Sequence, residues 1–269
     1  MEGKIIYFDQ NILSEYLDEG DIDLVNAVNL LKGGNKIVYS PAHIEEFAVP
    51  YMNNSNEEIK FRVLSELNKL SELTRNIEVS PGFDKPMHLK EEHPIECFKR
   101  VVDHYDLNPI LEKQESDQLK KFKDTDKKGE VSNVVSNNDS SILLQEEHSM
   151  VLNGRFHLDI FAAISARKAG LREFKYPDIL RSHTAFERCI ELTFNYLEII
   201  RYKPETVKKS RSRMHDVSHA VYASTADIIV SEDAKFCKKL EAVYKYWGID
   251  TVIYSKEKLI SEVGTVENT

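Results

Sequence analysis

The chain has 269 residues, of which 36 are basic and 45 are acidic, so its formal net charge is −9. Ten glycines, eight prolines and a hydrophobic fraction of 41% exclude a collagen-like or generally disordered chain. The acid excess excludes a surface that coats nucleic acid broadly. The length suits one large domain or two small ones.

Neither membrane insertion nor secretion is expected. No apolar stretch approaches the roughly 20 residues that a membrane-spanning helix needs. The first apolar run, residues 5–8, is interrupted at Asp9, which is unlike a secretory signal. The three cysteines are scattered without paired spacing, at Cys97, Cys189 and Cys237. This usage is typical of a reducing compartment, so we expect a cytoplasmic protein.

The first fifty residues have a β–α–β pattern. Strand-like and helix-periodic segments alternate there, at residues 4–8, 11–17, 24–31 and 36–39. Ser40 followed by Pro41 is typical of an N-cap and a first helical position. We therefore expect a further helix to begin at Pro41 and to end near Pro50.

The middle of the chain is predicted to be mostly helical. Residues 55–58 fit a capping box. Apolar residues at helical spacing indicate helices near residues 59–73, 94–106, 155–170 and 182–202. Residues 112–141 are rich in Lys, Asp, Glu, Ser and Asn and poor in large apolar side chains, so we expect a mobile surface excursion there.

The C-terminal part returns to an α/β pattern. Its predicted helices and strands alternate, at residues 212–224, 228–230, 234–247 and 251–254. The apolar run 228–230 is typical of a parallel strand that is covered on both faces. We therefore predict an α/β fold with a parallel sheet flanked by helices, its core formed by residues 1–52 and 201–269 and interrupted by a helical insertion, residues 53–200.

Acidic residues stand just beyond the predicted strands. Asp9 follows the first strand, Glu45 and Glu46 lie in the helix after the second, and Asp233 follows the strand 228–230. Asp216 lies on the helix before that strand. Each of these residues alone also fits a helix cap, a turn or a hydrogen-bonded surface pair. Together they fit a site for a hard divalent cation, because open parallel sheets bind ligands at the carboxyl ends of their strands.

The order of these motifs resembles the PIN-domain nuclease family. The resemblance rests on four stretches: Ile5-Ile6-Tyr7-Phe8-Asp9, Ser40-Pro41-Ala42-His43-Ile44-Glu45-Glu46-Phe47, Asp216-Val217-Ser218-His219-Ala220, and Ile228-Ile229-Val230-Ser231-Glu232-Asp233. It covers roughly residues 4–50 and 212–256, and residues 53–200 have no counterpart in the simple, shorter members of the family.

The resemblance implies a metal-dependent nuclease that hydrolyses phosphodiesters, more often in RNA than in DNA. It implies that Asp9, Glu46, Asp216 and Asp233 surround Mg²⁺ or Mn²⁺. Glu45 is the rival of Glu46, which we prefer because a bulky apolar residue, Phe47, follows it directly. His215 and His219 are accessory candidates on the same helix as Asp216.

A basic stretch precedes Asp216 and is the candidate substrate contact. Its cationic residues are Lys208, Lys209, Arg211 and Arg213. Beside a metal centre they could hold the phosphates that flank the scissile bond. A solvated basic loop is the alternative interpretation.

Two other functions compete with the nuclease hypothesis. His215-Asp216-Val217-Ser218-His219 is one methylene away from the zinc-protease pattern H-E-x-x-H, and the adjoining His-Asp pair is also compatible with an all-helical metal phosphohydrolase. Alternatively, the chain is a non-catalytic PIN-like module that binds a partner. A toxin or phage-defence effector controlled by an antitoxin or other regulatory protein, and a homo-oligomer, are compatible with either PIN-like interpretation.

Overall fold

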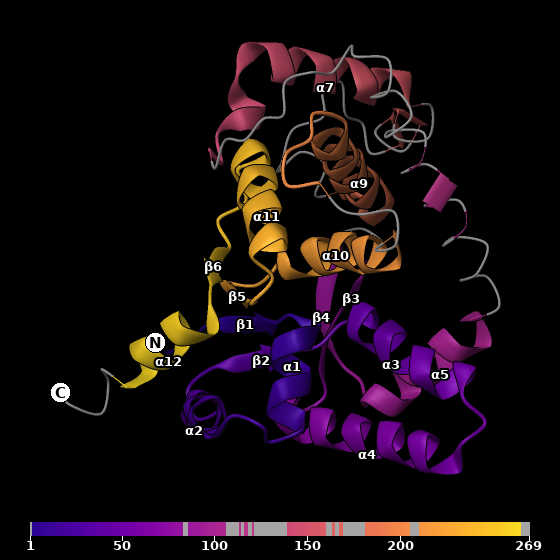
Figure 1. Ribbon diagram of the computed structural model, residues 1–269, viewed down its shortest axis with the longest axis vertical. Coiled ribbons are helices and arrows are strands. Elements are labelled where there is room, and N and C mark those ends of the chain that lie inside the picture. The colour runs from indigo at the N-terminus through magenta and orange to yellow at the C-terminus, as the bar shows by residue number, and fades with distance from the viewer. Residues whose placement is uncertain are drawn as a thin grey trace.

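A four-stranded parallel sheet forms the centre of the computed structural model (Figure 1), which describes residues 2–82, 86–105, 113, 116–117, 120, 139–159, 163–164, 167–168, 181–204 and 210–264. The strand order is β2-β1-β5-β6. The bounds of these strands are Ile5–Phe8 (β1), Lys36–Val38 (β2), Ile228–Val230 (β5) and Val252–Tyr254 (β6). The prediction of an α/β fold with a parallel sheet flanked by helices is confirmed.

The centre of the sheet joins segments that are far apart in the sequence. In β1, Ile6 pairs with Ile37 of β2 on one side and with Ile228 of β5 on the other. From β1 the chain therefore winds first toward one edge of the sheet and later returns to build toward the other edge. The carboxyl ends of β1 and β5 lie at this switch point, which is where open α/β sheets place their ligand crevice.

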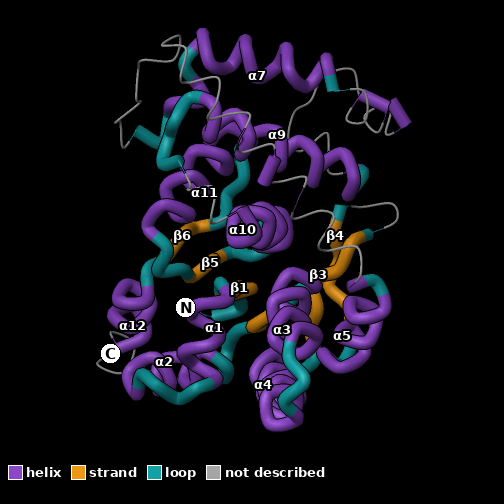
Figure 2. Tube along the Cα trace, turned by 45° about the vertical axis from the view of Figure 1, so that its right-hand side comes forward, coloured by secondary structure: helices purple, strands orange, loops and turns teal. Residues whose placement is uncertain are grey.

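Helices cover both faces of the sheet (Figure 2). Those packed mainly on one face are α1 (Gln10–Leu17), α2 (Ile22–Leu31), α3 (Pro41–Asn53), α4 (Glu57–Thr74), α5 (Pro94–Asp103) and α12 (Lys256–Gly264). On the other face lie η3 (Ile142–Leu144), α7 (Glu146–Leu158), α9 (His183–Ile199), α10 (Ser210–Ala223) and α11 (Ala234–Trp247). None of the helices within the described ranges is both long and apolar enough to cross a membrane.

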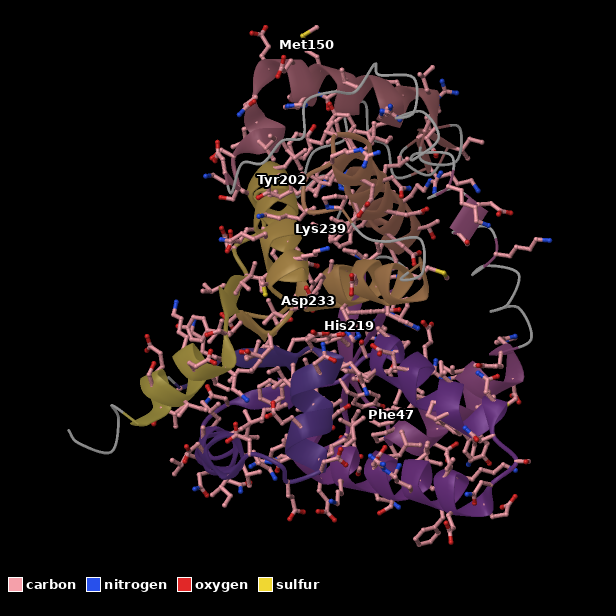
Figure 3. The ribbon with its side chains drawn as sticks, in the orientation of Figure 1. Phe47, Met150, Tyr202, His219, Asp233 and Lys239 are labelled. Atoms are coloured by element: carbon pink, nitrogen blue, oxygen red, sulfur yellow. The ribbon has the colours of Figure 1, made fainter. Side chains whose placement is uncertain are left out.

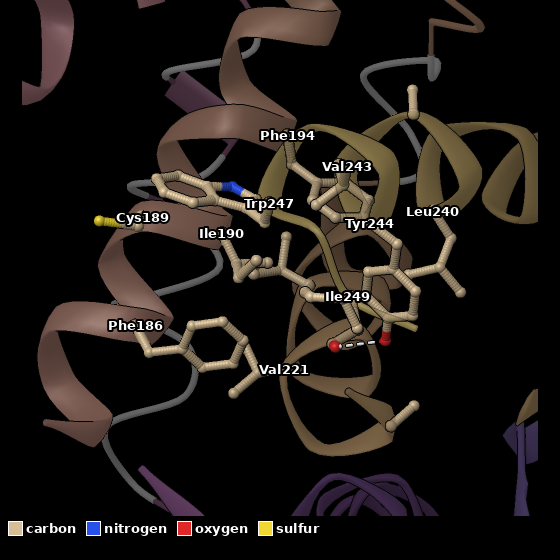
Figure 4. Close-up of a cluster of buried hydrophobic side chains, with 14 of the residues drawn as sticks. Phe186, Cys189, Ile190, Phe194, Val221, Leu240, Val243, Tyr244, Trp247 and Ile249 are labelled. Carbon is tan, nitrogen blue, oxygen red and sulfur yellow. Dashed lines mark hydrogen bonds between the residues drawn. The ribbon is translucent and has the colours of Figure 1, made fainter. Parts of the chain in front are cut away.

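Each face of the sheet has its own hydrophobic core. Strand side chains alternate between them: Tyr7 and Ile229 join the core under α9, α10 and α11, whereas Ile6 and Ile228 join the core on the opposite face. The first core contains the aromatic side chains Phe186, Phe194 and Trp247, and Tyr244 donates a hydrogen bond to the Ala220 carbonyl at 2.7 Å (Figure 4). All three residues of β5 are buried, as the apolar run predicted.

The helix after β2 begins as predicted but ends later. Ser40 is its N-cap and Pro41 its first residue. The helix continues through Pro50 to Asn53, so the predicted end near Pro50 is wrong. Proline has no N–H, and the carbonyl of Glu46 consequently lacks the usual helical partner at position 50.

An antiparallel hairpin is the element that the sequence analysis missed in residues 53–200. It comprises β3 (Ile77–Pro81) and β4 (Met87–Glu91). The end of β2 joins it, because the Tyr39 N–H donates to the Ile77 carbonyl at 3.1 Å and the Val79 N–H donates to the Tyr39 carbonyl at 2.7 Å. The description of this segment as a helical insertion therefore needs correction, since part of it continues the β-structure beyond β2.

Two other expectations for the middle of the chain have different outcomes. The helix predicted at 155–170 is confirmed in part: α7 spans Glu146–Leu158 and so begins before the predicted range, and residues 163–164 and 167–168 are also helical. Most of that predicted range beyond residue 159 lies outside the described residues, as does most of the expected excursion at 112–141.

Candidate metal centre

A small pocket of about 60 Å³ opens at the carboxyl ends of β1 and β5. The residues that line it are Asp9, Gln10, Asn11, Glu46, His215, Asp216, His219 and Asp233. Figure 3 shows His219 and Asp233 near the middle of the molecule, with Lys239 on the side of α9. The four carboxylates proposed from the sequence thus meet in one pocket, although they come from four different segments of the chain.

Local structure holds two of these carboxylates. Asp9 caps α1, and its Oδ1 accepts a hydrogen bond from the Gln10 N–H at 2.8 Å. Asp233 caps α11, and its Oδ1 accepts from the N–H groups of Lys235 and Phe236, each at 2.9 Å. Helix N-termini supply these donors, so both side chains are oriented by the helices that follow their strands.

Ser231 links the two capping aspartates. Its hydroxyl donates to Asp9 Oδ2 at 2.8 Å and accepts from the Asp233 N–H at 3.2 Å. Sequence reasoning did not select Ser231. Its position directly after β5 and two residues before Asp233 was the available signal.

Glu46 is held by a histidine from α10. His219 Nε2 donates to Glu46 Oε1 at 2.8 Å, and the other ring nitrogen, Nδ1, lies 2.6 Å from the Tyr7 hydroxyl. The His219 ring is almost completely buried. It therefore contacts Glu46, whereas the neighbouring Glu45 does not line the pocket.

Two of the carboxyl groups in the pocket have a raised pKa. Burial raises the pKa of Asp9, and the charge of Glu46 adds to this effect while His219 and Ser231 oppose it. Burial likewise raises the pKa of Asp216 to about 8, with Lys239 opposing the shift and Asp9 and Asp233 adding to it. The negative charges of these groups disfavour one another, so a divalent cation would remove an existing electrostatic cost.

In the Glu46–His219 pair the pKa shifts favour the charged forms of both side chains. Burial alone would raise the pKa of Glu46, but the hydrogen bond and charge of His219 hold it below its ordinary value. Burial disfavours a charged His219 ring, yet Glu46, Asp9 and Asp216 together raise its pKa. The raised pKa favours the imidazolium form, whose positive charge would partly offset the charge of the pocket.

Glu45 precedes Glu46 on α3 but does not line the pocket. Burial raises its pKa to about 7, and the charges of Glu187 and Glu46 add to the effect although His219 opposes it. Glu187 comes from α9, in the middle segment of the chain. Because Glu45 is outside the pocket lining, the geometry favours Glu46 as the ligand candidate.

The zinc site considered above would need an available ring nitrogen on His219 as well as on His215. Both ring nitrogens of His219 already contact protein groups, Glu46 and Tyr7. A zinc ion would have to displace one of these buried contacts before His219 could bind it together with His215. The zinc metallohydrolase interpretation therefore receives no support from this arrangement.

The predicted basic substrate contact is only partly described. Lys208 and Lys209 lie outside the described residues. The backbone of Arg211 and Arg213 belongs to α10, but their side chains are outside the description. This part of the prediction stays a prediction.

Lys239 is a buried cation that sequence reasoning missed. Its side chain is 1% exposed, and its Nζ lies 2.7 Å from Glu198 Oε1, which is also buried. Its charge acts on Asp216 from the α11 side. The pair therefore connects α9 to the wall of the pocket.

A second group of metal-ligand atoms lies away from the pocket. Within the described ranges, only Glu78, Glu92 and Cys97 bring three such atoms within 4.8 Å of one another. Lys90 Nζ lies 3.5 Å from Glu78 and 3.2 Å from Glu92, and Arg100 contacts both carboxylates. Burial also raises the pKa of the Cys97 thiol. Since the two negative charges already have two cationic partners, we interpret this group as an ion network that ties the hairpin to α5.

The chemistry of the pocket nevertheless fits a hard divalent cation. Four carboxylates supply oxygen ligands, and Oε1 of Gln10, which also lines the pocket, is buried without a hydrogen-bond partner. No three Asp, Glu or His ligand atoms of the pocket lie within 4.8 Å of one another. Mg²⁺ or Mn²⁺ bound there would be held by one or two of these carboxylates together with several waters.

Comparison with known proteins does not decide the family. No family model, curated protein or solved structure matches the chain. The function is therefore inferred from the residues of the pocket and from the order of the motifs in the sequence.

Proposed function

We propose that the chain is a metal-dependent nuclease that hydrolyses phosphodiester bonds, with RNA as the preferred substrate over DNA. One observation supports this proposal above all: four carboxylates from the ends of β1 and β5 and from α3 and α10 line one pocket at the switch point of a parallel sheet. Asp9, Glu46, Asp216 and Asp233 would hold Mg²⁺ or Mn²⁺.

A divalent cation held there would activate water and stabilise the charge that develops on the phosphodiester. The protein side chains have separate tasks. Asp9 and Asp233 are oriented by the N-termini of α1 and α11, and Ser231 fixes their spacing. His219 orients Glu46 and leaves the second oxygen of that carboxylate for a ligand.

The reason for naming a nuclease is that the order of the four motifs in the sequence resembles the PIN-domain family. Carboxylate sites of this kind serve other phosphoryl chemistry as well, and the preference for RNA comes from the resemblance alone. A toxin or phage-defence role with a regulatory protein partner belongs to the same hypothesis. So does binding of the substrate phosphates by Lys208, Lys209, Arg211 and Arg213.

A cleavage assay tests the proposal directly. The purified chain is incubated with labelled single- and double-stranded RNA and DNA, with Mg²⁺, with Mn²⁺ or with chelator. We expect metal-dependent cleavage that Asp9→Asn abolishes and that the exposed control Asp250→Asn retains. Calorimetric titration with Mn²⁺ follows binding separately from cleavage. If Asp9→Asn binds Mn²⁺ and cleaves as fast as the wild type, the assignment is wrong.

A further inference from the structure

A buried chain of hydrogen bonds runs from the pocket into the protein interior. It begins at Glu46 and passes through His219 to the Tyr7 hydroxyl, which lies 2.8 Å from Ser40 Oγ. Ser40 Oγ in turn lies 3.3 Å from His43 Nδ1. A carboxylate at the pocket is thereby connected to β1 and to the start of α3.

The inner end of this chain is anchored by backbone groups. His43 Nε2 lies 2.7 Å from the Phe8 carbonyl, which can only accept, so this nitrogen must carry a proton and donate it. His43 Nδ1 accepts from the Ser40 N–H at 3.0 Å. The roles of both His43 nitrogens are therefore determined, and the ring is fixed between β1 and α3.

The chain is also packed tightly. Tyr7 and Ser40 are 0% exposed, and His43 and His219 are each 1% exposed. The His43 ring centroid lies 4.7 Å from that of Tyr7 and 4.9 Å from that of His219. Buried polar side chains that are fully bonded keep one arrangement, because each alternative leaves a group unsatisfied.

The orientation of the Glu46 carboxylate depends on this hydrogen-bond network more than the orientations of the two capping aspartates do. Asp9 and Asp233 are held by backbone N–H groups of their own helices. In the part of the chain that the structure describes, His219 is the hydrogen-bond partner recorded for Glu46. The orientation of this carboxylate is consequently set by the His219 ring, and the ring is set by Tyr7.

We propose that Tyr7 is a positioning residue of the metal site: with Ser40 and His43 behind it, Tyr7 holds the His219 ring so that Glu46 faces the cation. This inference rests on the proposed function, because it assigns Glu46 to the metal. Tyr7 itself does not line the pocket, and it acts through His219.

Tyr7→Phe tests the inference because it removes only the hydroxyl. The Mn²⁺ dissociation constant, measured by calorimetry, should rise roughly tenfold, as for other outer-shell partners of metal ligands. Tyr39→Phe is the matched control. Tyr39 is equally buried and its hydroxyl is also hydrogen-bonded, to Glu78 and to the Glu92 carbonyl, but it lies outside the pocket network. This control should lose stability but keep the wild-type Mn²⁺ affinity.

A double-mutant cycle separates positioning from general destabilisation. In a His219→Ala background, Tyr7→Phe should cause no further loss of Mn²⁺ affinity, because its route to Glu46 is already gone. Ser40→Ala, which keeps Tyr7, should weaken Mn²⁺ binding in the same direction but less, and it preserves the test if Tyr7→Phe does not fold.

The outcomes distinguish this inference from the proposed function. If wild type and Tyr7→Phe bind Mn²⁺ equally, the positioning role is overturned while the metal site stands. An additional loss in the His219→Ala background, or an equal loss in Tyr39→Phe, also overturns it. If the folded wild type binds no Mn²⁺, the proposed function itself fails, and the inference fails with it.

Discussion

Replacing Asp216 by asparagine is expected to stabilise the protein in the presence of a chelator. Burial, with the charges of Asp9 and Asp233, raises the pKa of this carboxyl from 3.8 to about 8 in the folded protein. The unfolded chain therefore ionises it near pH 4, whereas the folded protein keeps it protonated up to about pH 8. The free energy of unfolding consequently falls as the pH rises between these values. An asparagine at this position cannot ionise, so the variant does not undergo this decrease.

The magnitude follows from the two pKa values. They differ by about 4, and one pKa unit corresponds to about 1.4 kcal/mol, so the ionised carboxyl lowers the free energy of unfolding by at most ~6 kcal/mol. Side-chain relaxation and water in the pocket screen the charge. We therefore expect Asp216→Asn to raise the free energy of unfolding by about 3 kcal/mol above pH 8. The melting temperature should then rise by about 5–10 °C.

Thermal and urea unfolding at pH 4.5 and at pH 8.5, both with chelator, measure this effect. The two proteins should differ least at pH 4.5, and the exposed control Asp250→Asn should follow the wild type at both values. Saturating Mn²⁺ should stabilise the wild type more than Asp216→Asn, because a ligand stabilises the state that binds it. An Asp216→Asn protein that is less stable than the wild type at pH 8.5 in chelator would refute the electrostatic reasoning.

Two further predictions concern the neighbours of the pocket. Glu46→Gln should weaken Mn²⁺ binding and cleavage roughly tenfold or more, whereas Glu45→Gln should leave both unchanged; equal losses in the two variants would contradict the choice of Glu46. Lys239→Met should lower the free energy of unfolding in urea by about 3–5 kcal/mol, since it leaves the Glu198 carboxylate buried without its cation. The double variant Lys239→Met/Glu198→Leu should recover much of this loss, and no recovery would count against the ion-pair explanation.

Local patterns were sufficient for the core of the sheet. The apolar runs that became β1 and β5 are short and uninterrupted, and an aspartate that caps the next helix follows β1 directly and β5 after two intervening residues. Such signals depend on residues adjacent in sequence, so they can be read before the fold is known. The same reasoning selected Asp9 and Asp233, because the carboxyl ends of parallel strands share one edge of the sheet.

The hairpin at Ile77–Glu91 had no comparable local signal. Its strands are partly polar, and Pro81 and Pro86 interrupt the β-prone pattern. The hairpin pairs with Tyr39 at the end of β2. Tyr39 and its partner Glu78 are 39 positions apart in the sequence. Likewise, α3 continues through Pro50 because packing on α4 and α5 offsets the missing hydrogen bond, which propensity alone does not anticipate.

The sequence by itself determined the class of the fold and the type of residue in the candidate site, because strand runs, helix caps and their carboxylates are local features. The sequence favoured Glu46 over Glu45, but only the tertiary structure shows that Glu46 lines the pocket and Glu45 does not. The two residues lie about 100° apart on one helix, so the rotation of α3 against the sheet selects which of them faces the pocket. It also decided that His219 contacts Glu46, and that Tyr7, 212 positions away in the chain, supports that histidine. Contacts of this kind form when distant segments pack together, and no spacing within one segment encodes them.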